Sequence, residues 1–476
     1  MKFTERAKLN LADVNKEVLE QWNAEDMFHK SIEEREGCPQ FIFFEGPPSA
    51  NGHPGIHHVM GRTIKDTFLR YKTMQGFQVK RKAGWDTHGL PVELSVEKSL
   101  GITKEDIGKK ISVDDYNDAC RKNVMMYTNE WTELTDKMGY WVDLEHPYIT
   151  YDNKYIETLW YLLKQLYNKG LLYKGYTIQP YSPAAGTGLS SHELNQPGCY
   201  RDVKDTTVTA QFLVKDVCEG LKGKGELLGE MPHDLKTYIL AWTTTPWTLP
   251  SNTALCVGPK IDYVAVKGKN PYSNEEAIYI LAEPRLSAYF QAEKDEEGNE
   301  KPLEILWRGK GTDLVGLHYQ QLMPWVKPCA LEDNKVVVKE EAFRVIPGDY
   351  VTTEDGTGIV HIAPTFGADD AKVAKDAGIP SLFIIDKAGD TRPMVDFTGK
   401  YFVKDDMNEE FVSLCVNESY WKHSGDFVKN AYDPKYNQGG KYDEKAANKD
   451  MDLNVVLCLE MKEEGTAFKI EKHVHN

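Results

Sequence analysis

At 476 residues, with 41% hydrophobic and 11% aromatic residues, the chain is long enough for two or three well-filled domains. Its net charge of −16 excludes a global basic field, so a nucleic-acid partner would need local basic patches. No apolar run approaches the roughly 18–20 residues that a membrane span requires. The eight cysteines lie far apart and form no Cys-x-x-Cys pair, which argues against a disulfide framework and favours a reducing cytosol. We therefore expect a cytoplasmic, multidomain enzyme that does not enter a membrane.

The first 200 residues predict a strand, a loop, a helix and a second strand. The stretch "NLADVNKEVLEQWN" is typical of an amphipathic helix, and "QFIFFEG" is typical of a buried strand that enters a functional loop. Apolar residues recur at helical spacing from 57 to 75, Gly76 follows as a C-cap, and "FQVKRKAGWD" predicts the next strand. Such a unit implies parallel strands and a nucleotide-type α/β sheet. Further helices are expected over 113–138 and 155–169.

Near residue 200 the pattern changes to short β-branched and aromatic runs, such as "TTVTAQFLV", "TYILAWTTT" and "DYVAVKG". Turn residues separate these runs, so we expect a mostly β domain from 201 to about 415. A polar stretch follows, and "LNVVLCLEMKEEG" predicts a last helix that stops at Gly465. In the tail "TAFKIEKHVHN" we expect no closing element. The predicted segments are thus 1–200, 201–415 and 416–476.

Two stretches of the first segment carry candidate binding chemistry. The loop "GPPSANG" lies between strand and helix, where backbone N–H groups and the helix dipole can face a phosphate. Taken alone, it could equally be a rigid turn. In "AGWDTHGLPVE", Asp86 follows the next strand, where open α/β sheets bind ligands. A carboxylate there can hold a substrate ammonium group, although the residue alone favours a helix cap.

Six motifs taken together identify a family. The stretches "GPPSANG", "TIKD", "RKAGWDTHGLPVE", "LTDKMGYWVD", "PYIT" and "LLYKG" occur in the order and spacing of class I aminoacyl-tRNA synthetases, and the chain resembles the isoleucyl-tRNA synthetases most. The resemblance implies an α/β fold: the first half of a Rossmann-type parallel sheet, interrupted by a mostly β editing domain. It also implies that isoleucine, ATP with Mg²⁺ and tRNA(Ile) are the partners of a monomeric ligase. Such an enzyme forms isoleucyl-adenylate, charges tRNA(Ile) and hydrolyses mischarged valyl-tRNA(Ile).

The resemblance also implies residues of the synthetic site. Those expected to hold isoleucine or its adenylate are Gly46, Pro47 and Asp86, with Asp86 taking the ammonium group. Those expected to face ATP are Asn51, Gly55, His57 and His58, the two histidines being the catalytic residues.

The His-x-Gly-His signature of this family is altered here. Its four positions fall on "GIHH", so Gly55 replaces the first histidine and His57 replaces the glycine. One interpretation is that His57 supplies from its new position the donor that residue 55 has lost. The other is impaired or altered ATP use, with a possible change in the binding of adenylate-mimicking inhibitors. We expect the compensated, active site because the remaining motifs are intact.

The β-rich segment carries a second set of candidates. In "AWTTTPWTLPSN" and "GTGIVHIAPTFGADD" the resemblance implies an editing site made of Thr243, Thr244, Thr245, Thr248, His361 and Asp370. Without the resemblance, the threonines would be ordinary strand surface, the histidine a satisfied core residue and "ADDAKVAKDAG" a capped helix start. With it, Asp370 is expected to bind the ammonium of a valyl group while an oriented water hydrolyses the ester. No Ser-His-Asp array is implied.

The family pattern breaks in two places. Some relatives carry a zinc-binding Cys-x-x-Cys before the insertion, but Ser182 and Ala185 stand at those positions, so we expect no metal there. The Lys-Met-Ser-Lys-Ser loop, the second half of the sheet and the anticodon-binding domain are also not found. We therefore expect an N-terminal portion that does not activate isoleucine alone. A freestanding deacylase of mischarged tRNA and a non-catalytic tRNA-binding remnant are the alternatives.

Overall fold

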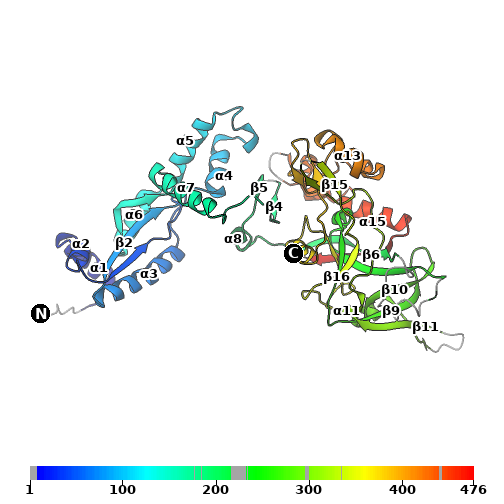
Figure 1. Ribbon diagram of the computed structural model, residues 1–476. Coiled ribbons are helices and arrows are strands. Elements are labelled where there is room, and N and C mark those ends of the chain that lie inside the picture. The colour runs from blue at the N-terminus through cyan, green and yellow to red at the C-terminus, as the bar shows by residue number, and fades with distance from the viewer. Residues whose placement is uncertain are drawn as a thin grey trace. The chain divides into compact units, whose positions relative to one another are not determined.

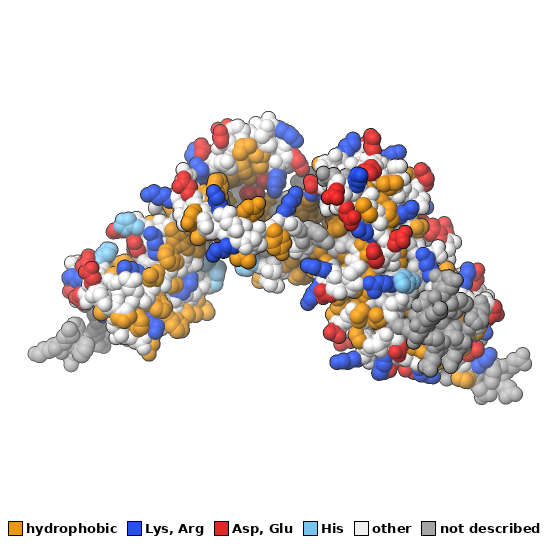
Figure 2. All heavy atoms as spheres, in the orientation of Figure 1, with side chains coloured by type: hydrophobic (Ala, Val, Ile, Leu, Met, Phe, Trp, Pro, Cys, Tyr) orange, Lys and Arg blue, Asp and Glu red, His pale blue; other side chains and the backbone are white. Residues whose placement is uncertain are grey.

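The computed structural model describes residues 8–175, 177–183, 185–215, 232, 234–294, 300–333, 335–438 and 442–475. The chain divides into two compact units, Met1–Gly175 and Tyr176–Asn476 (Figure 1). The division at residues 200 and 415 stays a prediction. No helix among the described residues is both long and apolar enough to cross a membrane. Acidic and basic side chains are interspersed over the face shown in Figure 2.

The first unit is a three-stranded parallel sheet, ordered β1-β2-β3, with helices. Its elements are α1 (Leu11–Ala24), α2 (Met27–Glu33), β1 (Gln40–Phe44), α3 (Ile56–Met74), β2 (Gln78–Trp85), α4 (Leu90–Leu100), η1 (Lys104–Asp106), α5 (Val113–Val124), α6 (Thr128–Lys137), β3 (Asp143–Ile149) and α7 (Asn153–Asn168). The consecutive elements β1, α3 and β2 confirm the predicted strand–helix–strand arrangement. Beneath them lies a small core of Leu69, Val79, Ala83, Tyr140 and Val142.

Two helices of this unit differ from simple expectation. The helical structure predicted over 113–138 is present, but it is broken between α5 and α6. There the N–H of Tyr127 donates to the carbonyl of Ala50, 2.9 Å away, instead of to a helical neighbour. On α3, the periodic apolar residues Met60, Ile64 and Phe68 are 66%, 55% and 65% exposed. The face of α3 that is buried carries Leu69 together with two polar side chains.

The second unit is built on a nine-stranded mixed sheet. The strands in path order are β13 (Ile305–Lys310), β9 (Asp262–Lys269), β10 (Glu276–Ala282), β7 (Thr237–Thr243), β17 (Ile359–Ile362), β8 (Ala254–Val257) and β16 (Arg344–Pro347), with β6 (Val203–Leu213) pairing both β7 and β20 (Ala467–His475). The strand pairs outside it are β4 (Tyr181–Ser182) with β5 (Thr187–Gly188), β11 (Glu293–Lys294) with β12 (Glu300–Lys301), β14 (Cys329–Glu332) with β15 (Lys335–Val338), and β18 (Ile384–Ile385) with β19 (Thr391–Arg392).

Short helices connect these strands. They are α8 (Ser191–Leu194), η2 (Pro246–Ser251), η3 (Glu283–Arg285), α10 (Leu286–Tyr289), α11 (Gly311–Leu314), α12 (Ala368–Asp376), η4 (Lys404–Asp406), α13 (Glu409–Cys415), η5 (Glu418–Lys422), η6 (Asn430–Tyr432), η7 (Pro434–Tyr436), α14 (Glu444–Ala447) and α15 (Leu453–Glu463). The parallel sheet of the first unit and the mostly β second unit confirm the predicted fold class.

The end of the chain differs from the prediction. Helix α15 is confirmed, and Gly465 follows it with a φ of +73°, a conformation that favours glycine. The expectation of no closing element after it is wrong, because Ala467–His475 forms β20 and pairs antiparallel with β6. Ala467 and Phe468 at the start of β20 are only 1% exposed. Their burial in the sheet core explains why this charged stretch forms a strand.

Candidate functional site

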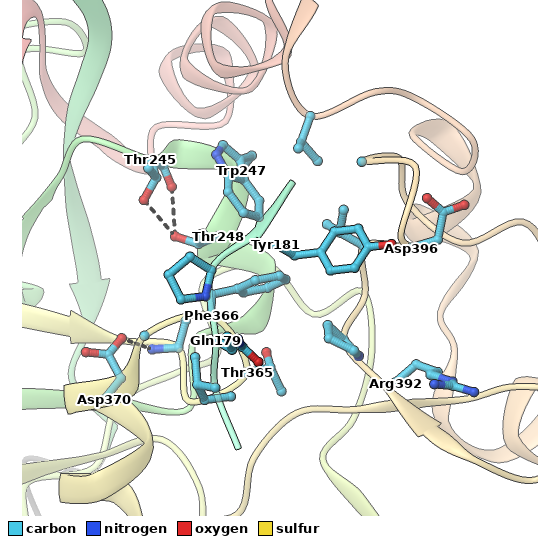
Figure 3. Close-up of a pocket in the computed structure, with 18 of the residues that line it drawn as sticks. Gln179, Tyr181, Thr245, Trp247, Thr248, Thr365, Phe366, Asp370, Arg392 and Asp396 are labelled. Carbon is cyan, nitrogen blue, oxygen red and sulfur yellow. Dashed lines mark hydrogen bonds between the residues drawn. The ribbon is translucent and has the colours of Figure 1, made fainter. Parts of the chain in front are cut away.

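A cavity of about 1020 Å³ lies within the second unit (Figure 3). Its walls come from five stretches far apart in sequence: residues 177–188 with the β4–β5 hairpin, 242–248 after β7, 360–370 around β17 and α12, 386–402 beyond β18, and 428–432. All six residues of the predicted second site line this cavity, namely Thr243, Thr244, Thr245, Thr248, His361 and Asp370. The fold therefore brings together two motifs more than a hundred residues apart.

The threonines form a chain of hydroxyl groups where β7 turns into η2. The N–H of Thr245 donates to Oγ1 of Thr243 at 3.1 Å, and the Thr245 hydroxyl lies 3.3 Å from that oxygen. The same hydroxyl lies 3.2 Å from Oγ1 of Thr248. The Thr248 hydroxyl donates to the carbonyl of Thr245, 2.8 Å away. These local bonds hold the turn and point a row of hydroxyls at the cavity.

His361 fixes one end of this row from β17, and its tautomer follows from its partners. The amide nitrogen of Asn252 donates to the carbonyl of Ala254 and lies 3.2 Å from Nδ1 of His361, so Nδ1 accepts. Burial lowers the pKa of His361 to about 4, so the ring is neutral near pH 7 and carries its proton on Nε2. That N–H donates to Oγ1 of Thr248 at 2.9 Å. With both nitrogens engaged, the ring positions Thr248 and has no free lone pair to act as a base.

Asp370 enters the cavity from the first turn of α12. Its Oδ2 accepts the N–H of Ala363 at 2.9 Å, and within the described part of the chain Oδ1 accepts no hydrogen bond. Burial raises the pKa of the Asp370 carboxyl, the Ala363 N–H opposes that rise, and the neighbouring Asp369 adds to it. The expected helix start is real, but Gly367 and not an aspartate is its N-cap. Asp370 is thus free to serve as an anchored carboxylate for a cation in the cavity.

The sequence analysis did not predict several residues of this site. Asn252 and Tyr319 form a buried support, the Tyr319 hydroxyl donating to Oδ1 of Asn252 at 2.7 Å. The rings of Trp247 and Phe366 meet edge to face in the cavity wall, with centroids 4.9 Å apart. Tyr181 lines it as well, from the β4–β5 hairpin. In that hairpin Ser182 is used structurally, because its Oγ accepts the N–H of Ala185 at 3.2 Å.

The first unit brings its two predicted motifs together at the ends of β1 and β2. The loop with Gly46, Pro47 and Asn51 meets the end of β2 where the N–H of Asp86 donates to the carbonyl of Pro48, 3.1 Å away. The N-cap of α4 is Gly89, so Asp86 is not the helix cap that its sequence position suggests.

Helix α6 holds this loop in place. Its Trp131 indole N–H donates to the carbonyl of Gly52 at 2.9 Å, and the loop residue His53 lies 2.7 Å from Glu130. Sequence analysis also missed Glu45, a 3% exposed carboxylate that contacts Lys65 and Tyr140 directly before Gly46.

The altered histidine signature opens α3. Nδ1 of His58 accepts the N–H of Gly55 at 2.9 Å, so the Nε2 side of this ring is the donor side when the ring is neutral. Burial is the main cause of a lowered pKa at His58, followed by the nearby His57 and Arg62. The exposed ring of His57 folds back so far that a Cβ on Gly55 would lie 2.8 Å from its Cε1. His57 therefore occupies the space that a side chain at residue 55 would need.

Comparisons with known proteins identify the family. The family model of class I tRNA synthetases (I, L, M and V) matches residues 17–423. Over the whole chain, the isoleucine–tRNA ligases of Bacteroides thetaiotaomicron and Porphyromonas gingivalis are 64% and 57% identical. The chain spans about two fifths of the length of these relatives, 41% and 40%.

Among solved structures, the editing domain of the P. knowlesi cytosolic leucyl-tRNA synthetase is similar at 19% identity and a TM-score of 0.28, over 37% of this chain and 63% of that one. The corresponding P. falciparum domain is similar at 16% identity and a TM-score of 0.26, over 37% and 68%. Because the family model covers most of the residues, in both units, the chain belongs to the class I tRNA synthetases (I, L, M and V).

Proposed function

We propose that the chain is part of an isoleucine–tRNA ligase whose second unit hydrolyses valyl-tRNA(Ile). The match of the whole chain to part of these isoleucine–tRNA ligases, at 57–64% identity, supports the ligase. The convergence of the threonine row, His361 and Asp370 on one cavity carries the proposal of hydrolysis. The whole protein would act as a cytoplasmic monomer.

Specificity explains why a ligase needs the second reaction. Isoleucyl-tRNA synthetases are the standard example of a pocket that gains only about 1–3 kcal/mol from one methylene, too little to reject valine. A second, smaller site that hydrolyses the valyl ester restores accuracy. In this chain the threonine methyl groups would bound that site and limit the side chain it admits.

The hydrolytic step follows from the donors and acceptors in the cavity. The ionised Asp370 would bind the ammonium group of the valyl ester and fix its carbonyl beside the threonine hydroxyls. A water attacks the carbonyl carbon, the bond to the ribose oxygen breaks, and that oxygen takes up a proton as valine leaves. Since neither nitrogen of His361 has a free lone pair, the proton acceptor is the substrate or a second water. His361 acts by holding Thr248.

The first unit would serve the synthetic reaction of the whole protein. Asp86, with Gly46 and Pro47, would hold isoleucine, while Asn51 and the start of α3 would face ATP bound with Mg²⁺. The carboxylate of isoleucine attacks the α-phosphate, so catalysis is positioning and charge stabilisation. The His57 ring beside Gly55 supports the compensated signature, in which His57 and His58 both serve ATP.

Deacylation tests the proposed function. The purified chain should release valine from valyl-tRNA(Ile) and leave isoleucyl-tRNA(Ile) intact. Release of both amino acids would contradict a second site that admits valine and excludes isoleucine. Release of neither, from a chain with native circular dichroism, would contradict hydrolysis by the second unit.

A further inference from the structure

The cavity has a second end that the hydrolytic step does not use. Figure 3 shows Thr245, Thr248 and Asp370 on one side, Tyr181, Arg392 and Asp396 on the other, and Phe366 between them. At about 1020 Å³ the cavity is at the top of the roughly 300–1,000 Å³ range of small-molecule pockets. It therefore has room for more than one aminoacylated nucleoside.

An aromatic pair with one exposed ring marks this second end. The ring centroids of Tyr181, on β4, and Phe397 lie 4.8 Å apart with an angle of 34° between the planes. Phe397 is 59% exposed, although a residue this apolar is usually buried. Aromatic faces that stay exposed beside a ligand cavity are the groups on which single-stranded nucleic acids stack their bases.

The charged groups around this pair favour a base over a phosphate. Arg392 lies over the Phe397 ring at 5.7 Å, but its guanidinium is held by Asp386 at 2.9 Å and Asp390 at 3.3 Å. Its positive charge is therefore already balanced and is not available for a phosphate group.

Asp396 provides an acceptor for a base edge. Its Oδ1 accepts the N–H of Thr398 at 2.8 Å and the N–H of Lys400 at 3.2 Å, which fixes the carboxylate in a turn. In the described part of the chain Oδ2 accepts no hydrogen bond. A carboxylate oxygen of this kind accepts from the exocyclic amine of a cytosine.

We propose that Tyr181, Phe397 and Asp396 form a base-binding subsite for the nucleotide that precedes the aminoacylated terminal nucleoside of tRNA. The inference rests on the proposed function for the identity of the ligand. With the ester at Asp370, the terminal adenosine lies against Trp247 and Phe366, and the preceding base reaches the aromatic pair. In tRNA that base is a cytosine, whose amine donates to Oδ2 of Asp396 while its ring stacks on Phe397.

Two amide ligands that cannot be hydrolysed test this subsite by calorimetry. One is 3′-valylamido-3′-deoxyadenosine, and the other is a short RNA ending in cytidine-cytidine followed by that nucleoside. Phe397→Ala should weaken binding of the RNA about tenfold and leave binding of the nucleoside unchanged. Tyr442→Ala, which removes another exposed aromatic ring outside the cavity, should change neither.

A base exchange tests Asp396 separately. Replacing the penultimate cytosine by uracil removes the amine, so the wild-type chain should bind the uracil RNA several-fold more weakly. Asp396→Asn keeps Oδ1 for the turn and should abolish this preference. Equal losses for RNA and nucleoside would place the terminal adenine at the pair instead and overturn the proposal. Tighter RNA binding by Phe397→Ala would also overturn it, because the Phe397 ring would then obstruct the cavity and not bind a base.

The two proposals fail separately. If the chain does not hydrolyse valyl-tRNA(Ile) but binds these ligands as described, the proposed hydrolysis falls and the subsite stands. If valine is released and Phe397→Ala has no effect on RNA binding, the proposed subsite is contradicted and the proposed hydrolysis is supported. If the wild-type chain binds neither ligand, the subsite is overturned as well.

Discussion

Nε2–H of His361 donates to Oγ1 of Thr248 across 2.9 Å, and this bond links β17 to the turn after β7. Both side chains are almost fully buried, at 7% and 5% exposure. The Thr248 hydroxyl in turn donates a hydrogen bond to the Thr245 carbonyl. The direction of each bond is therefore set, and the histidine orders the hydroxyl row without exchanging protons near neutral pH.

The stability of the second unit should depend on His361 in acid. Its folded pKa of about 4 lies below the ordinary value of 6.5, so the unfolded chain takes up the proton first as the pH falls. This contribution to stability is fully present above pH 6.5 and is lost progressively toward pH 4. The difference corresponds to about 3 kcal/mol of unfolding free energy. Urea unfolding of the wild type and of His361→Gln at both ends of this range measures it, and equal pH dependence in the two proteins would contradict it.

A matched pair of threonine substitutions tests the hydrogen bond itself. Thr248→Val keeps the shape but leaves Nε2–H of His361 buried without an acceptor, so unfolding free energy should fall by about 1–3 kcal/mol. Thr365 is also buried in the cavity wall, yet its Oγ1 has no partner among the described residues. Thr365→Val should therefore be neutral or stabilising. Equal losses in the two variants, measured by urea unfolding, would show that the His361 bond contributes nothing.

The acid limb of deacylation should report the ionisation of Asp370. Burial raises its pKa, and Asp369 raises it further, so activity should fall at a pH above the ordinary aspartate value of about 3.9. Asp369→Asn removes one cause of the rise while leaving Asp370 in place. The limb in a profile of kcat/KM against pH should therefore move to lower pH. If the acid limb of the kcat/KM profile does not move, or moves to higher pH, another group controls the loss of activity in acid.

Gly367 leaves the space that the Asp370 carboxylate occupies. A Cβ added there would lie 2.7 Å from Cγ of Asp370, and the backbone φ of −108° is open to alanine. Gly367→Ala should displace the carboxylate and lower kcat/KM for valyl-tRNA(Ile) by about 10- to 100-fold, with a small change in unfolding free energy. Gly61→Ala, where a Cβ meets nothing within 4 Å, is the control. Full activity in Gly367→Ala would mean that the position of Asp370 is not critical.

The sequence reveals those parts of the site that lie in local motifs. Threonines at a strand end and an aspartate in a helix start are visible in short stretches, and both reach the cavity as expected. Asn252 and Tyr319 were not predictable, because Asn252 contacts Tyr319 and His361 across 67 and 109 residues. Nothing in "PYSPAAGTGLSS" indicates that Tyr181 lines a cavity made by residues two hundred positions later.

The fold shows the same limit. Periodicity located α3 and the strands on either side of it, since each forms from neighbouring residues. It did not locate the break between α5 and α6, because the Tyr127 N–H bonds to Ala50 in a distant loop. It also missed β20, because the lysine, glutamate and histidine residues of this stretch give no sign in the sequence of its pairing with β6, 264 residues away at Thr207 and Glu471. Long-range hydrogen bonds decided both cases.

The most direct test of the account is hydrolysis of three esters by the 476-residue chain: valyl-, isoleucyl- and N-acetylvalyl-tRNA(Ile). The account predicts release of valine alone, because N-acetylation removes the ammonium group that Asp370 binds. Asp370→Ala should abolish release, while Asp369→Ala should retain it. Rapid hydrolysis of the acetylated ester, or undiminished valine release by Asp370→Ala, would contradict the claim that this cavity recognises its substrate through Asp370.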